Sequence, residues 1–200
     1  MFNQLRHIKT FFILANFLFL FSILVSPANS VPFISKTTEL SMGRSADKEV
    51  IQQFGVYQNK PLEIYINEIG QKLVSKLVNK EFSKFFFKLV DSSEINAFAL
   101  PGGYIYVTRG LLASLNSEAE LASVLGHEIG HVTMHHGAKM MIRSIGSQIL
   151  SFGGAIASPK NASQWLAVSS AMFQQINMGY GREAELESDA QGMMNAMDAG

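Results

Sequence analysis

Two histidines four residues apart, with a glutamate beside the first, are the residues of this sequence best suited to chemistry. His127-Glu128-Ile129-Gly130-His131 has the pattern H-E-x-x-H, which places both imidazoles on one face of a helix. Two such imidazoles can bind one Zn²⁺, and the Glu128 carboxylate beside them can take a proton from water. The pattern predicts zinc-dependent hydrolysis, with His127 and His131 as metal ligands and Glu128 as general base.

A third ligand is expected downstream, in the acidic cluster that begins at Arg182. On a helix, Glu185 and Asp189 would share one face. Glu185 could complete a His₂Glu site with an open fourth position, and Asp189 could accept the free ring N–H of a ligand histidine. Spacing alone does not choose Glu185 over Glu183 or Glu187, and a run of acids on a helix is more often a solvated face.

Two further histidines follow the motif. On a straight helix His135 stands about 12 Å along the axis from His127, at about 1.5 Å per residue, and cannot share its ion. His136 would lie on the opposite face. Both are therefore expected to pack or to form hydrogen bonds.

The helix that carries the motif is predicted to begin at Ser117, because Ser117-Glu118-Ala119-Glu120 forms a capping box, and to end at Gly137. Runs of β-prone residues and turn residues predict three strands before it, and apolar spacing predicts helices on both sides. The strands are Phe85–Val90, Ala97–Leu100 and Tyr104–Thr108, and the helices are Ser45–Phe54, one from Pro61, a hairpin over 142–178, and one from Tyr180 through Met197.

Three motifs together carry a family resemblance: Asn96-Ala97-Phe98-Ala99-Leu100-Pro101-Gly102-Gly103, the H-E-x-x-H motif, and Arg182-x-x-Glu185-x-x-x-Asp189. Over roughly residues 40 to 200 the chain resembles the zinc metallopeptidase family of the CAAX prenyl protease and HtpX type, in its soluble, exported, BepA-like periplasmic branch. The resemblance implies that Glu185 is the third ligand of one Zn²⁺ per chain and that Asp189 supports a ligand histidine. It also implies an α+β, mostly helical fold, with a thermolysin-like zincin (gluzincin) core and a small β-sheet beside the active-site helix.

The function expected from these features is endopeptidase cleavage of exported, misfolded or envelope proteins. The strand formed by Asn96, Ala97, Phe98 and Ala99 is a candidate edge for an extended substrate, with an ordinary core strand as the alternative. Arg182 is a candidate oxyanion stabiliser, although a salt bridge at the helix start fits it better. A client-binding chaperone with a structural metal, and a hydrolase of non-peptide amides, remain open.

The N-terminal residues and the composition indicate an exported protein. Arg6 and Lys9 precede an apolar run over 11–25 and a stretch of small residues, which predicts a signal peptide over 1–30, a linker over 31–45 and a peptidase domain over 46–200, with truncation at the C-terminus left open. An uncleaved N-terminal anchor is the alternative. We expect export, to the periplasm in a Gram-negative bacterium.

Charge and cysteine content limit the choice of partners. Sixteen basic residues balance sixteen acidic ones, there is no cysteine, and no basic stripe interleaved with aromatic residues is present. Nucleic acid is therefore not an expected partner, and the fold must be stable without disulfides. Polypeptide substrates are expected, and peripheral association with the membrane or with envelope proteins is left open.

Overall fold

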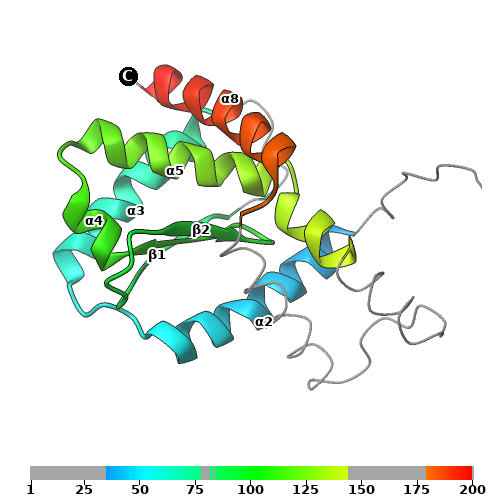
Figure 1. Ribbon diagram of the computed structural model, residues 1–200, viewed down its shortest axis with the longest axis horizontal. Coiled ribbons are helices and arrows are strands. Elements are labelled where there is room, and N and C mark those ends of the chain that lie inside the picture. Colours follow the sequence, from blue (N-terminus) through cyan, green and yellow to red (C-terminus); the bar gives the residue numbers. More distant parts are fainter. Residues whose placement is uncertain (1–34, 78–81, 83, 144–178, 200) are drawn as a thin grey trace, which may run out of the picture. The chain divides into compact units, whose positions relative to one another are not determined.

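The computed structural model describes residues 35–77, 82, 84–143 and 179–199. Helices dominate this part of the chain and a small sheet lies among them, so the expected mostly helical α+β class is confirmed (Figure 1). The expected signal peptide and most of the expected helical hairpin fall outside the described residues. The elements are α2 (Lys36–Phe54), α3 (Lys60–Ser75), β1 (Phe86–Val90), β2 (Ala97–Leu100), β3 (Tyr104–Thr108), α4 (Arg109–Ser114), α5 (Glu118–Thr133) and α8 (Arg182–Ala199).

The three strands form one sheet in the order β1-β3-β2, with β1 parallel and β2 antiparallel to the central strand β3. The strand predictions are confirmed, except that β1 begins at Phe86 rather than Phe85. The reversal between β2 and β3 uses Gly102 and Gly103, whose φ angles of 78° and 93° suit glycine. The order makes β2 an edge strand, with one side that pairs with no other strand in the described part of the chain.

Successive side chains of each strand point to opposite faces of the sheet, and both faces are buried. Ile105 and Val107 face the helices α3 and α5, while Tyr104 and Tyr106 face α2. In Figure 1 the helices α3 and α5 lie on one side of the sheet and α2 lies on the other. Helix α5 packs on β2 and β3 and also against α8, so it lies between the sheet and α8.

Helix α5 begins as predicted, although its capping box differs in one bond. The Ser117 hydroxyl accepts the backbone N–H of Glu120 at 3.2 Å, as expected. The Glu120 carboxylate accepts from the backbone N–H of Asn116 at 2.7 Å, one residue before the expected donor. Both contacts satisfy donors that the first turn leaves open, so the start of the helix is fixed.

The predicted end of α5 at Gly137 was wrong. The helix ends at Thr133, and His135 adopts a φ of 57° before residues 136–143 become helical again. The Nδ1 of His135 lies 2.7 Å from Oε2 of Glu39, a buried carboxylate on α2. A residue with positive φ breaks the helix, and the contact with Glu39 stabilises this conformation.

The predicted start of α2 at Ser45 was also wrong, and residues 36–45 of the expected linker are helical. The helix begins at Lys36, where the Ser35 hydroxyl accepts the N–H of Thr38. Its polar first half folds because Glu39 and Met42 are buried against the rest of the protein. The short helix α4, capped by Thr108, was not predicted. Among the described residues, no helix has the length and apolar character needed to cross a membrane.

Candidate metal centre

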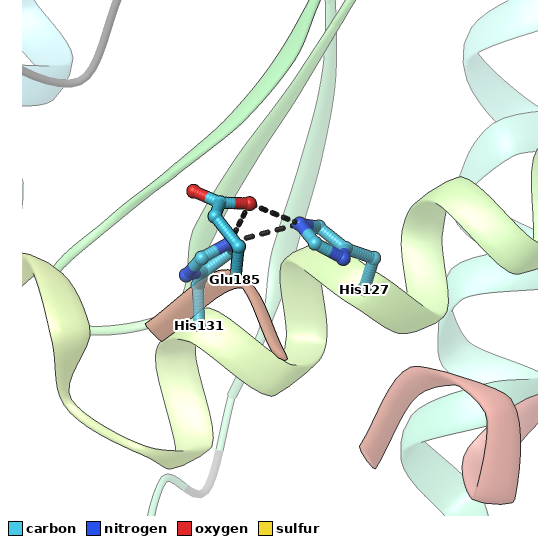
Figure 2. Close-up of side chains that lie close together, drawn as sticks. All are labelled: His127, His131 and Glu185. Atoms are coloured by element: carbon cyan, nitrogen blue, oxygen red, sulfur yellow. Dashed lines mark hydrogen bonds and ion pairs between the residues drawn. The ribbon is translucent and has the colours of Figure 1, made fainter. Parts of the chain in front are cut away.

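The structure brings His127, His131 and Glu185 together, although Glu185 is distant from the histidines in sequence. The Nε2 atoms of the two histidines lie 2.9 Å apart on α5. Oε2 of Glu185, from α8, lies 3.2 Å from Nε2 of His127 and 3.6 Å from Nε2 of His131. One ligand atom from each residue falls within 4.8 Å of the others (Figure 2). The three side chains thus point at a common position.

The outer ring nitrogens indicate where the protons of the two histidines lie. Nδ1 of His127 lies 2.8 Å from Oδ1 of Asp189, so Nδ1 carries the proton that the carboxylate accepts. Nδ1 of His131 lies 2.9 Å from Nδ1 of His136. With its proton on Nδ1, His127 directs its Nε2 lone pair toward the Glu185 carboxylate, and Nε2 of His131 faces the same carboxylate oxygen. Three electron-pair donors converging in this way fit a cation, and a His₂Glu set is one that Zn²⁺ accepts.

Glycines allow α8 to approach α5 closely enough for this arrangement. A Cβ on Gly192 would lie 2.7 Å from the backbone nitrogen of His127, and one on Gly126 would lie 2.9 Å from the carbonyl oxygen of Gly192. A Cβ on Gly130, in the same crossing, would lie 3.1 Å from Cα of Ser188. Because backbone meets backbone here, the first turn of α8 lies directly over the motif and presents Glu185 to the histidines.

Glu128 lies beside the ligand histidines and is almost completely buried, with 6% of its surface exposed. Within the described part of the chain its Oε2 has no hydrogen-bond partner. Burial raises the pKa of Glu128 to about 8, and the negative charge of Glu185 adds to this effect. A buried carboxylate oxygen without a partner costs about 1–3 kcal/mol, so Glu128 has the properties of a base that is completed by water or substrate.

His131 is more buried than His127, and its environment keeps it neutral. Burial lowers the pKa of His131 to about 3, and His127 and His136 lower it further by their proximity. A neutral imidazole is the form that binds a metal. The burial of this ring therefore favours ligation over protonation across the physiological pH range.

Tyr180 is a site residue that the sequence analysis missed. Its ring stacks on His131, with centroids 4.0 Å apart, and its hydroxyl donates to the carbonyl oxygen of Ala99 at 2.5 Å. Its backbone N–H donates to Oε1 of Glu185 at 2.9 Å, which orients the other carboxylate oxygen toward the histidines. Gly179 and Gly181, with φ angles of 87° and 96°, allow the tight bend around it. The Gly-Tyr-Gly sequence was the available signal.

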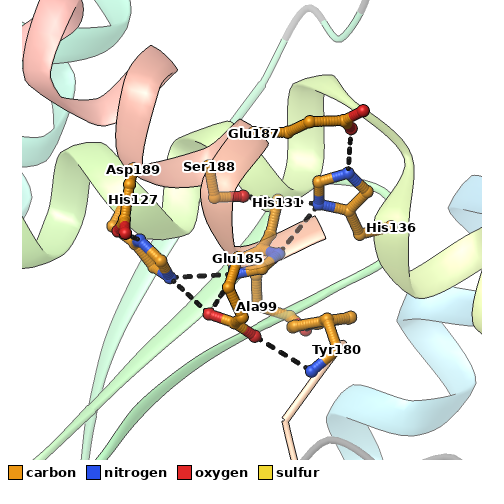
Figure 3. A network of polar contacts seen from close by, with 9 residues as sticks. All are labelled: Ala99, His127, His131, His136, Tyr180, Glu185, Glu187, Ser188 and Asp189. Carbon is orange, nitrogen blue, oxygen red and sulfur yellow. Dashed lines mark hydrogen bonds and ion pairs between the residues drawn. The ribbon is translucent and has the colours of Figure 1, made fainter. Parts of the chain in front are cut away.

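The sequence analysis also missed the contacts that His136 makes with His131, Glu187 and Ser188. His136 was expected on the face of α5 opposite His127, but α5 ends at Thr133 and the chain folds back, so His136 contacts His131 (Figure 3). Its Nε2 lies 3.0 Å from Oε2 of Glu187, and Oγ of Ser188 lies 3.3 Å from its Nδ1. The expectation that His135 and His136 form hydrogen bonds is confirmed, while the expected position of His136 is wrong.

The remaining candidates lie around the centre. Arg182 is the first residue of α8 and is exposed, and no ion pair between described residues involves it, so its role as an oxyanion stabiliser stays a prediction. Asn96 to Ala99 lead into and form β2, the edge strand next to α5. Asn96 is partly buried, and its carbonyl accepts from the N–H of Thr108 on β3 at 3.1 Å.

Comparison with known proteins identifies the family. Residues 62–200 match the model of peptidase family M48. The chain is 32% identical over 162 residues to the beta-barrel assembly-enhancing protease of Escherichia coli, with 78% of this chain and 33% of that protein covered. The corresponding protein of Yersinia pestis is 32% identical over 167 residues, with 80% and 34% covered.

A second group of relatives is mitochondrial by name. The human mitochondrial metalloendopeptidase OMA1 is 33% identical over 120 residues, with 56% of this chain and 22% of OMA1 covered. The chain spans about a third of the length of the assembly-enhancing proteases. The resemblance inferred from the three motifs is confirmed. This chain belongs to peptidase family M48.

Proposed function

We propose that this chain is a zinc-dependent endopeptidase in which His127, His131 and Glu185 hold one Zn²⁺ and Glu128 is the general base. The observation that supports this most is the convergence of two Nε2 lone pairs and a carboxylate oxygen next to the buried, unpaired oxygen of Glu128. The helix α5 over a small sheet, joined by a glutamate from a later helix, also fits a thermolysin-like zincin core of the gluzincin type.

The proposed chemistry assigns a task to each residue. Zinc held at this position would supply a Lewis acid that polarises a peptide carbonyl and lowers the pKa of water. Glu128 takes the proton of the attacking water and returns it to the leaving nitrogen, as a base with a pKa near the working pH can do. Asp189 holds the His127 ring, and Tyr180 packs against His131 and holds Glu185.

The substrate is proposed to bind as an extended strand along β2. Because Asn96 pairs with Thr108 on β3, hydrogen-bonded pairs alternate along β2, and the backbone groups of Ala97 and Ala99 face the outer edge. At this edge the Tyr180 hydroxyl donates a hydrogen bond to the Ala99 carbonyl. A peptide that pairs with Ala99 displaces this hydroxyl, so edge binding and the position of Tyr180 are coupled. Recognition through main-chain bonds gives little dependence on substrate sequence.

The cellular setting is proposed from the N-terminal sequence and from the relatives. Arg6, Lys9 and the apolar run over 11–25 support export, to the periplasm in a Gram-negative bacterium. The assembly-enhancing proteases act, by name, on β-barrel assembly. We therefore propose exported and envelope polypeptides, misfolded ones above all, as the substrates, with peripheral contact to the membrane or to its proteins.

The test compares the purified chain with two variants. Zinc content and casein cleavage are measured for the parent, Glu128→Gln and Glu185→Ala, with Glu183→Gln as a control, because Glu183 is an exposed acid on the same turn of α8. The proposal predicts one zinc per parent chain, normal zinc without cleavage in Glu128→Gln, and loss of zinc in Glu185→Ala. A parent that binds zinc and casein but cuts no better than Glu128→Gln would instead be a client-binding protein with a structural metal.

A further inference from the structure

His131 is connected through His136 to a carboxylate, whereas His127 contacts its carboxylate directly. Nδ1 of His131 lies 2.9 Å from Nδ1 of His136, and Nε2 of His136 lies 3.0 Å from Oε2 of Glu187. His131 is 2% exposed and His136 is 5% exposed, so water has little access to the bond between the two rings. The two contacts connect Glu187 on α8 through His136 to the ring of His131 (Figure 3).

The hydrogen-bonding partners of His136 and His131 determine which of their ring nitrogens carry protons. The Glu187 carboxylate has no proton to give, so Nε2 of His136 donates to it. A neutral imidazole has one ring proton, which leaves Nδ1 of His136 as an acceptor. The contact between the two Nδ1 atoms then requires that His131 donates. Its proton is placed on Nδ1, and the lone pair is left on Nε2, the atom that faces His127 and Glu185.

The backbone places His136 for this role in a way that a continuous helix would not. At the break after Thr133, His135 takes a φ of 57°, and its ring is held by Glu39 of α2 at 2.7 Å. His136 thereby turns back toward His131 instead of pointing away from it. The Ser188 hydroxyl, fully buried, also contacts Nδ1 of His136, at 3.3 Å, and can share this acceptor with His131.

We propose that His136 is a positioning residue for the metal centre: held by Glu187, it keeps the proton of His131 on Nδ1 and thereby directs the Nε2 lone pair of His131 to the metal. The inference rests on the proposed metal site. It gives Glu187 a task distinct from that of Glu185, two residues earlier on the same helix. Each ligand histidine is then connected to a carboxylate on α8. His127 contacts Asp189 directly, and His131 is connected to Glu187 through His136.

The experiment measures Zn²⁺ affinity by competition with a chelator in the purified chain and four variants. His136→Leu removes the acceptor, and His136→Asn restores one, because the Asn amide oxygen can occupy the position of Nδ1. Glu187→Gln removes only the charge, at a side chain that is 48% exposed, so folding is not at risk. Glu183→Gln is the matched control. We expect about 10–100-fold weaker binding in His136→Leu, a smaller loss in Glu187→Gln, and near-parent affinity in His136→Asn and Glu183→Gln.

A second readout separates positioning from a packing role. In the Co²⁺-loaded protein, the ring N–H protons of His127 and His131 give shifted NMR signals that exchange with water. Two slowly exchanging signals are expected in the parent, and the His131 signal should be lost or exchange rapidly in His136→Leu but persist in His136→Asn.

Each outcome decides between the two proposals. If His136→Leu binds Zn²⁺ as tightly as the parent, or if the His131 signal is unchanged in that variant, the positioning role is wrong and the proposed function still stands. A parent that binds no Zn²⁺ overturns both. Equal losses in His136→Leu and His136→Asn, with the His131 signal retained, would show that the ring only fills space.

Discussion

The close crossing of α5 and α8 makes Gly192→Ala a sensitive test of how the metal centre is built. The new Cβ would lie 2.7 Å from the backbone nitrogen of His127, whereas ordinary contact begins at 3.4 Å. Backbone atoms on both sides cannot rotate away, so α8 must move outward by about 0.7 Å, the difference between these two distances. Glu185 and Asp189 move with it. Metal–ligand distances tolerate only about 0.2 Å, so the shift weakens metal binding.

The effect on stability is smaller, because two terms oppose each other. Overpacking costs about 1–3 kcal/mol, while replacing glycine by alanine inside a helix gains about 1 kcal/mol. The net destabilisation of the metal-free protein is therefore about 0–2 kcal/mol. The loss of Zn²⁺ affinity should reach at least about tenfold, which corresponds to about 1.4 kcal/mol.

The assay combines thermal melts in excess chelator with Zn²⁺ competition. Ala190→Gly is the control, since Ala190 is exposed on the same helix and its change costs helix propensity without touching the crossing. It should lower the melting temperature and leave Zn²⁺ affinity unchanged. If Gly192→Ala binds Zn²⁺ as tightly as the parent, the glycine contact does not position Glu185, and the reasoning from the crossing fails.

Three further predictions concern single side chains. Asp189→Asn should weaken Zn²⁺ binding by about 10–100-fold in chelator competition, because His127 loses a charged acceptor; an unchanged affinity would contradict the role of the 2.8 Å bond. Tyr180→Phe should lower KM for a peptide substrate, because it frees the Ala99 carbonyl, and a raised KM would argue against strand binding at β2. In the metal-free protein, Glu128 holds a proton that the unfolded chain releases, so the free energy of unfolding should fall as pH rises from about 4.5 to about 8. Thermal melts of Glu128→Gln should lack this pH-dependent decrease.

Much of this arrangement was predictable because it depends on local signals. The β-prone residues of β3 and the glycines before it predict the sheet, and Ser117 marks the start of α5. The H-E-x-x-H spacing predicts two converging imidazoles. The choice of Glu185 came from resemblance, because its selection over Glu187 depends on a crossing between helices that no local pattern describes.

The parts that were missed depend on distant partners. The first half of α2 is polar in sequence, and it is stabilised by a buried Glu39 whose partner, His135, is 96 residues away. The end of α5 has no glycine at the residue with positive φ, and nothing local distinguishes His135 from a helical residue. The position of His136 follows from that break, so the same long-range contact concealed it too.

These long-range contacts meet on α8, which contributes Glu185 to the ligand set, Asp189 to His127, and Glu187 to His131 through His136. None of these groups reaches the motif unless α8 is packed on α5. Since the unfolded chain has no such site, binding of the ion and docking of α8 must stabilise each other. Zinc should therefore raise the melting temperature of the parent by much more than that of Glu185→Ala. It should raise the melting temperature of Gly192→Ala by an intermediate amount, because that variant keeps every ligand but loses the close crossing.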